Sequence, residues 1–120
     1  MSDKPQITDS HCHLDFPDFN DDLSQVINNA LQNGVSRMVT ICTRLKNEPL
    51  VRKISEDYKA VYYAAGNHPM SVASEPMANV NELICLSGHP KFIAIGETGL
   101  DYYYTSETAE AQKKSLEIHI

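Results

Sequence analysis

The sequence has few cysteines and few basic residues, and each shortage excludes a class of protein. Its three cysteines, Cys12, Cys42 and Cys85, are too few and too widely spaced for a disulfide framework or a cysteine-based zinc site, so we expect them to be reduced. Ten Lys and Arg against sixteen Asp and Glu give a formal net charge of −6. This balance argues against binding nucleic acid by broad phosphate neutralisation, but it leaves room for an enzyme that holds phosphate through metal ions.

Long apolar runs are also missing. No window approaches the ~18 uninterrupted apolar residues that a membrane span requires, and the start, Met1 to Gln6, is polar where a signal peptide would be apolar. We therefore expect a cytoplasmic protein with no membrane partner. With 42% hydrophobic and 22% charged residues in 120, the composition is that of a folded globular protein, and we assign residues 1–120 to a single domain.

Four short runs rich in β-branched and aromatic residues predict strands at Gln6–Ser10, Val35–Cys42, Ala60–Ala65 and Lys91–Ile95. Apolar residues at helical spacing follow each run. The predicted buried stripes are Leu23, Val26, Ile27, Ala30 and Leu31, capped by Asn20 or Asp21 and ended by Gly34; Leu50, Val51, Ile54 and Tyr58 after Pro49; Met77, Val80, Leu83 and Ile84 after Pro76, ended by Gly88; and Leu116 and Ile120 in a helix starting near Ser106.

Strand and helix alternate four times, with a period near the ~30 residues of a βαβ unit. This order predicts an α/β fold with a parallel sheet and right-handed crossovers. In such folds the functional groups gather beyond the carboxyl ends of the strands. The chemically unusual segments of this sequence lie at those positions.

Two histidines, His11 and His13, follow directly from the first predicted strand. Alternate strand residues share a face, so both imidazoles should point to one place while Cys12 points to the helix layer. This spacing suits a bidentate metal clamp, and the alternative is a pair of surface or hydrogen-bonded histidines. Asp9 could orient an imidazole, bind metal or serve a structural role.

Two further segments end later strands. Pro69 should hold His68 extended at the tip of the third strand, where it is either a functional residue or a hydrogen-bonded loop residue. Glu97 lies between two glycines after the fourth strand, where a carboxylate needs a cationic partner. It is a candidate metal ligand and catalytic residue, and its alternative is an ion pair with Arg37 or a lysine.

Together, His11, His13 and Glu97 form a mixed imidazole and carboxylate set at one rim. Such a set suits Zn²⁺, Mn²⁺ or Fe²⁺, with Mg²⁺ possible where carboxylates and water dominate. Three ligands could hold one metal with an open position. A bridging Glu97 could hold two, as in phosphoryl transfer to water.

With these segments the sequence closely resembles the TatD family of metal-dependent hydrolases. The matching segments are DSHCHLD (Asp9 to Asp15), GNHP (Gly66 to Pro69) and GETGLDYY (Gly96 to Tyr103), in the family's order and spacing. The resemblance implies the first four βα units of a (β/α)₈ TIM-type barrel. It also implies a site with two divalent metals (Zn, Mn or Mg), in which His11 and His13 hold one metal and Glu97 bridges both.

The resemblance further implies DNase activity, often 3′ to 5′ on single strands, with DNA as the substrate. It places His68 near the substrate, and we assign Asp101 and Tyr102 to substrate binding as well. Base stacking on Tyr102 to Tyr104 is one possibility, with at least one of the three packed in the core. The family's later ligands, two histidines and an aspartate from strands five, six and eight, are not among these 120 residues, and His119 does not replace them.

Three hypotheses follow. The first is a metal-dependent deoxyribonuclease, and the second is a hydrolase of another ester or amide bond, such as an aminoacyl ester on tRNA, because fold does not fix substrate. The third is a catalytically incomplete half barrel that pairs with its missing half or with itself. An open sheet of four strands leaves two unpaired edges and an uncovered inner face, so we expect the isolated chain to associate, to be partly molten or to aggregate.

Overall fold

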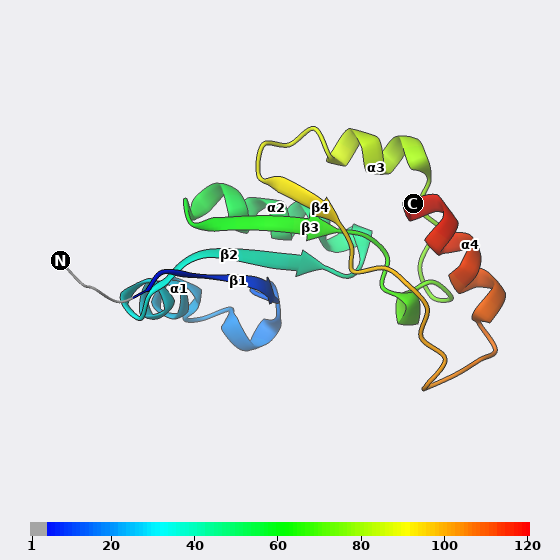
Figure 1. The fold of residues 1–120 in the computed structure, drawn as a ribbon, viewed down its shortest axis with the longest axis horizontal. Coiled ribbons are helices and arrows are strands. Elements are labelled where there is room, and N and C mark those ends of the chain that lie inside the picture. Colours follow the sequence, from blue (N-terminus) through cyan, green and yellow to red (C-terminus); the bar gives the residue numbers. More distant parts are fainter. Residues whose placement is uncertain (1–4) are drawn as a thin grey trace.

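The computed structural model describes residues 5–120, and its strands form one parallel sheet in chain order. Residues 1–4, which include most of the polar start, lie outside the described residues. The strands are β1 (Ile7–Cys12), β2 (Val35–Cys42), β3 (Val61–Ala65) and β4 (Phe92–Ile95), and the helices are α1 (Leu23–Gln32), α2 (Glu48–Asp57), α3 (Val80–Leu86) and α4 (Ala109–His119). Figure 1 shows all four strands running towards α4, and this alternation confirms the predicted parallel α/β order.

The middle of the sheet carries the core. On one face, Ile27 of α1 and Ile54 of α2 pack against Met38 and Val61, so these two helices cover the same side. Most of β2 and β3 is buried, whereas β1 and β4, which form the two edges, are mostly exposed. The opposite face keeps a small apolar cluster, Val39, Ile41 and Ala64, and bears the exposed Ile93 of β4 beside a cavity of about 380 Å³.

The N-terminal end of α1 differs from the prediction, whereas its C-terminal end agrees with it. Asp22, rather than Asn20 or Asp21, is the N-cap, and its side chain makes no capping hydrogen bond. At the other end, Gly34 has a φ of +96°, a left-handed conformation that glycine adopts without steric cost and that turns the chain into β2.

Several residues of the predicted stripes are exposed. In α3 only Leu83 is buried, because this helix packs against α4 beside the edge of the sheet rather than across its face (Figure 1). In α4 the buried residues are polar, while Leu116 is partly buried and Ile120 is exposed. The exposed members of the predicted stripes are Leu31, Leu50, Met77, Val80, Ile84 and Ile120.

No helix within residues 5–120 combines the length and the apolar character needed to cross a bilayer. The three cysteines are all free thiols. Cys12 and Cys42 lie against the helix side of the sheet, and burial raises the pKa of each thiol to about 12, which keeps both protonated near neutral pH.

Candidate metal centre at the carboxyl ends of the strands

The two edge strands bring their polar residues together at one rim. His11 is in β1 and Glu97 follows β4, and in a flat sheet three strand spacings of about 4.8 Å would hold these strands about 14 Å apart. Instead, His11 Nε2 lies 3.3 Å from Glu97 Oε2. The contact therefore depends on strong curvature of the sheet, as in a barrel wall.

A backbone carbonyl orients the imidazole of His13. Its Nδ1 lies 3.2 Å from the carbonyl oxygen of Ile41, which can only accept, so Nδ1 carries the proton and Nε2 keeps a lone pair. The ring stacks on Phe16 with centroids 4.7 Å apart and meets His11 edge-on at 5.1 Å. An imidazole held through one nitrogen by a carbonyl, with the other nitrogen free, is the usual arrangement of a metal-binding histidine.

His68 has the opposite proton arrangement. The backbone N–H of Met70 donates to His68 Nδ1 over 3.1 Å, so Nε2 carries the proton of the neutral ring. That Nε2 lies 3.4 Å from Glu97 Oε1. His68 therefore points an N–H at the carboxylate and offers no lone pair towards it, which suits a hydrogen-bond donor near a substrate better than a metal ligand.

Donor atoms of His11, His13 and Glu97 all lie within 4.8 Å of one another. Two imidazole nitrogens and a carboxylate oxygen match the ligand preferences of Zn²⁺ and Mn²⁺, so the residues present fit a divalent metal. The side chains of His11 and Glu97 are 51% and 36% exposed, which leaves the group open to solvent and to a substrate. Within residues 5–120, Glu97 contacts two histidines and neither Arg37 nor a lysine, so the structure gives no ion pair of the kind expected as the alternative for Glu97.

An irregularity in β1 places the two histidines. The pairing with β2 shifts between Asp9 and Cys12, and Asp9 Oδ1 accepts a hydrogen bond of 3.1 Å from the backbone N–H of His11 within this bulge. Asp9 thus holds the backbone, not an imidazole. Cys12 points away from the rim and donates to the carbonyl oxygen of Val39 at 3.4 Å, as the strand alternation predicted.

The remaining predicted site residues lie on the loop after Glu97. Asp101 Oδ1 accepts from the backbone N–H of Tyr103 at 3.0 Å, so its carboxylate stabilises the loop itself. Tyr102 is 44% exposed, and Tyr103 and Tyr104 are more exposed still, which contradicts the expectation that one of the three packs in the core. Within residues 5–120, neither Asp101 nor Tyr102 forms a hydrogen bond or ion pair with the rim histidines or Glu97.

Sequence reasoning missed the part that α4 plays at this rim. Its buried residues are polar, Gln112, Ser115 and His119, and two of them bond to the loops that carry His68 and Glu97. The available signal was their spacing of i, i+3 and i+7, which places all three on one helix face.

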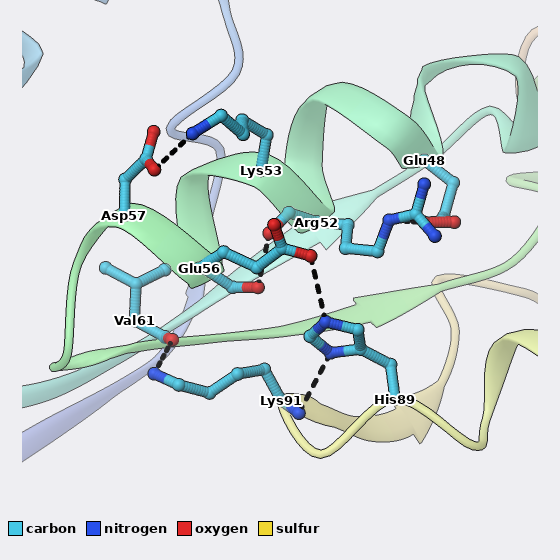
Figure 2. Close-up of polar contacts among 9 residues, drawn as sticks. Glu48, Arg52, Lys53, Glu56, Asp57, Val61, His89 and Lys91 are labelled. Carbon is cyan, nitrogen blue, oxygen red and sulfur yellow. Dashed lines mark hydrogen bonds and ion pairs between the residues drawn. The ribbon is translucent and has the colours of Figure 1, made fainter.

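A second histidine and carboxylate pair lies at the amino ends of the strands. His89 Nε2 is 3.1 Å from Glu56 Oε1 on α2, and His89 Nδ1 accepts from the backbone N–H of Lys91 at 3.1 Å (Figure 2). The Lys91 ammonium donates to the carbonyl oxygens of Tyr58, Lys59 and Val61 at 3.4, 2.8 and 2.7 Å. Both nitrogens of His89 are used, so this pair cannot bind a metal without breaking a bond.

Comparison with known proteins identifies the family. The model of the family described as TatD related DNase matches residues 8–120. The chain belongs to this family. It is 35% identical to an uncharacterized metal-dependent hydrolase of Buchnera aphidicola, covering 95% of this chain and 47% of the relative. It is 29% identical to the 3′-5′ ssDNA/RNA exonuclease TatD of Shigella flexneri, covering 82% of this chain and 38% of the relative.

Among solved structures, the chain is similar to the crystal structure of YJJV, a TatD homolog from Escherichia coli K12. The TM-score is 0.77 at 28% identity, and the match covers 94% of this chain and 43% of that one. This likeness confirms the predicted fold class, the first four βα units of a TIM-type barrel. The chain spans less than half the length of the relatives it matches.

Proposed function

We propose that this chain supplies the first metal ligands of a metal-dependent phosphodiesterase that removes nucleotides from the 3′ ends of single-stranded DNA. The convergence of His11, His13 and Glu97 donor atoms within 4.8 Å carries the proposal. The name of the Shigella flexneri relative supports the choice of a nucleic acid substrate. The net charge of −6 favours binding of the DNA through the metal centre at a strand end over binding along the phosphate backbone of a duplex.

The geometry supports a role for each of these residues. His13, through Nε2, and His11 would hold one divalent ion, Zn²⁺, Mn²⁺ or Mg²⁺, and Glu97 would help to hold this ion and a second one. Such ions, when bound, polarise phosphoryl oxygens and stabilise the charge of the transition state. His68 has its one free N–H at Nε2, 3.4 Å from Glu97 Oε1, and in the substrate complex it would donate this hydrogen bond to a phosphate oxygen instead. Exposed Tyr102 offers a face on which a base can stack.

A substrate panel with controlled metal content tests this function. A full-length protein containing this chain, stripped with chelator and reloaded with Mn²⁺, Zn²⁺ or Mg²⁺, should shorten a 5′-labelled single-stranded oligonucleotide from its 3′ end. A 3′-phosphorothioate version of the oligonucleotide is the matched control and should resist. Faster cleavage of aminoacyl esters or amides than of DNA would instead establish the second hypothesis, hydrolysis of another bond by the same metals.

The exposed edges and inner face favour a separate proposal for the 120-residue chain alone. Ile7 of β1 and Ile93 and Ile95 of β4 are 55%, 53% and 43% exposed, and leaving about 400 Å² of apolar surface in water forfeits about 10 kcal/mol. We expect this chain to self-associate or to melt without cooperativity, and to lack hydrolytic activity. Analytical ultracentrifugation and a thermal melt check the first expectation, and a nuclease assay in Mn²⁺ checks the second. A monodisperse, cooperatively melting monomer would contradict the structural part, and chelator-sensitive cleavage by it the catalytic part.

A further inference from the structure

The buried face of α4 is polar, and two of its three buried side chains, Gln112 and His119, hydrogen-bond to other segments, whereas the hydroxyl of Ser115 has no partner within residues 5–120. Gln112, Ser115 and His119 are 0%, 1% and 7% exposed. Burying such groups costs free energy unless they find partners, so a helix that merely filled space would present apolar residues here. The partners that Gln112 and His119 find are backbone groups of the two loops at the rim.

His119 connects α4 to the loop that carries His68. Its Nδ1 donates to the carbonyl oxygen of Ser115 at 2.7 Å, and its Nε2 accepts from the backbone N–H of Asn67 at 3.0 Å. Asn67 directly precedes His68, so the bond fixes the backbone from which that imidazole projects. Because both ring nitrogens are used, His119 is neutral, has one tautomer and cannot ligate metal.

Gln112 holds the loop that follows Glu97. Its Oε1 accepts from the backbone N–H of Asp101 at 2.7 Å, and its Nε2 donates to the carbonyl oxygen of the same residue at 2.9 Å. Nε2 also lies 3.0 Å from Thr108 Oγ1. A side-chain amide that pairs with both backbone groups of one residue fixes the position and the orientation of that residue together.

The two loops meet beneath the rim at a pair of glycines. The backbone N–H of Gly96 donates to the carbonyl oxygen of Ala65 at 3.1 Å, and Gly96 directly precedes Glu97. A Cβ on Gly66 would lie 3.2 Å from both Gly96 N and His119 Cδ2. Gly66 therefore lets the imidazole of His119, the His68 loop and the Glu97 loop touch at one point.

We propose that Gln112 and His119 are positioning residues that fix the His68 and Glu97 loops relative to each other and so set the 3.4 Å contact between His68 Nε2 and Glu97 Oε1. The catalytic value of this arrangement rests on the proposed function. The helix holds the two loops together from beneath, and neither residue touches substrate or metal.

Substitutions of His119 test whether α4 fixes the His68 and Glu97 loops. They are made in a full-length protein containing this chain, in the assembly that it forms in solution. His119→Leu removes both hydrogen bonds, whereas the amide of His119→Gln can still donate to one group and accept from the other. Peptides spanning residues 61–72 and 96–104 are followed by hydrogen exchange with mass spectrometry in the absence of metal. His119→Leu should increase exchange at least tenfold in both peptides, and His119→Gln should restore most of the protection.

His89→Leu is the matched control, because His89 also has both nitrogens hydrogen-bonded but lies at the other end of the sheet. It should lower the melting temperature without changing exchange in the two rim peptides. Should His119→Leu fail to fold, Gln112→Met removes three hydrogen bonds at similar volume, and it should raise exchange in the 96–104 peptide. Unchanged exchange in both rim peptides of the folded His119→Leu or Gln112→Met variant would overturn the proposal.

Metal binding separates this proposal from the proposed function. Calorimetric titration with Mn²⁺ should show an affinity about tenfold weaker for His119→Leu than for the unaltered protein, as for other outer-sphere supports of metal ligands. An unaltered protein that binds neither Mn²⁺ nor Zn²⁺ would refute the proposed function. The exchange measurements would still decide whether α4 positions the loops.

Discussion

Two groups of histidine and carboxylate side chains lie at opposite ends of the same sheet, and they differ in what they leave unbonded. At the carboxyl ends, His13 uses only Nδ1 in a hydrogen bond within residues 5–120, and Glu97 faces two histidines. At the amino ends, both nitrogens of His89 are used and Glu56 meets one of them. A histidine beside a glutamate therefore does not by itself indicate a metal site, and what distinguishes the rim group is that His13 keeps one nitrogen without a hydrogen bond within residues 5–120.

The two groups also differ in what they stabilise. Lys91 donates to three carbonyl oxygens between the end of α2 and the start of β3, so the amino-end group completes the hydrogen bonding of backbone. The rim group is itself held by backbone, through Ile41 and Met70. The amino-end group therefore stabilises the fold, whereas the rim group is oriented by the fold.

The largest expected effect comes from removing the rim carboxylate. Glu97→Gln should weaken Mn²⁺ binding by at least about 100-fold, because losing a ligand costs more than the 10- to 100-fold typical of an outer-sphere partner, and it should abolish hydrolysis. The corresponding change at the other end, Glu56→Gln, should leave metal affinity within about twofold. Calorimetry and element analysis of the dialysed proteins measure both. Equal metal content in the two variants would remove the distinction drawn between the groups.

A smaller effect separates neighbouring residues of the rim. His13→Ala should weaken the binding of one metal by about 100-fold, because it removes a ligand of that metal, and should leave a second metal less affected. Cys12→Ser should keep nearly full metal affinity, since the thiol points away from the rim and donates to the backbone carbonyl oxygen of Val39 in β2. The measurement is a two-site titration with each variant. Comparable losses from both substitutions would show that the described orientation of β1 is wrong.

At the amino ends the expected effect is on stability alone. Lys91→Met keeps the apolar stem but removes donors from three carbonyl oxygens, which should lower the free energy of unfolding by about 1–2 kcal/mol. Urea unfolding, followed by circular dichroism, measures the loss. A change in metal affinity beyond about twofold in this variant would mean that the two ends are coupled, contrary to the comparison.

The last effect appears only at alkaline pH and concerns a buried group with no ionic partner. Burial raises the pKa of Cys42 from 9.0 to about 12, so the folded state holds the proton more tightly than the unfolded state. Its contribution to stability is complete below pH 9.0 and is lost as the pH rises towards 12, by up to about 1.4 kcal/mol per pH unit. In Cys42→Ala the slope of unfolding free energy between pH 9 and 10.5 should flatten. An unchanged slope would assign the alkaline loss to other groups.

The sequence predicted the strands and the meeting of the rim residues at one edge because both depend on local patterns, whereas the role of these residues as metal ligands stays a prediction. Runs of β-branched residues end in His11, His13 and Glu97 at the same edge of a parallel sheet, whatever the rest of the fold does. Helix burial is less local. Met77, Val80 and Ile84 have the spacing of a buried stripe, but Met77 precedes α3, which begins at Val80, and the edge position of α3 leaves Val80 and Ile84 exposed.

Two features of the rim could not be read from periodicity. The bulge in β1 adds a residue between Asp9 and Cys12. The register in which β1 pairs depends on the neighbouring strand β2 as well, so the amino-acid sequence of β1 alone does not predict the bulge. The polar face of α4 follows a helical period too, but a scan for apolar stripes selects Leu116 and Ile120 instead. Gln112 and His119 can be buried because they form hydrogen bonds with backbone groups of loops that are distant in sequence.

The contact between His11 and Glu97 has a consequence for the whole chain, because it joins the first strand to the end of the last. These residues lie 86 positions apart in sequence (97 − 11), so a divalent ion held between them would close a loop that runs from the end of β1 through β2, β3 and β4. By loop-closure entropy, a link over this length corresponds to about 4 kcal/mol. The metal content of the protein would then act as a reversible crosslink, and chelation would loosen the curvature of the sheet as well as remove its chemistry.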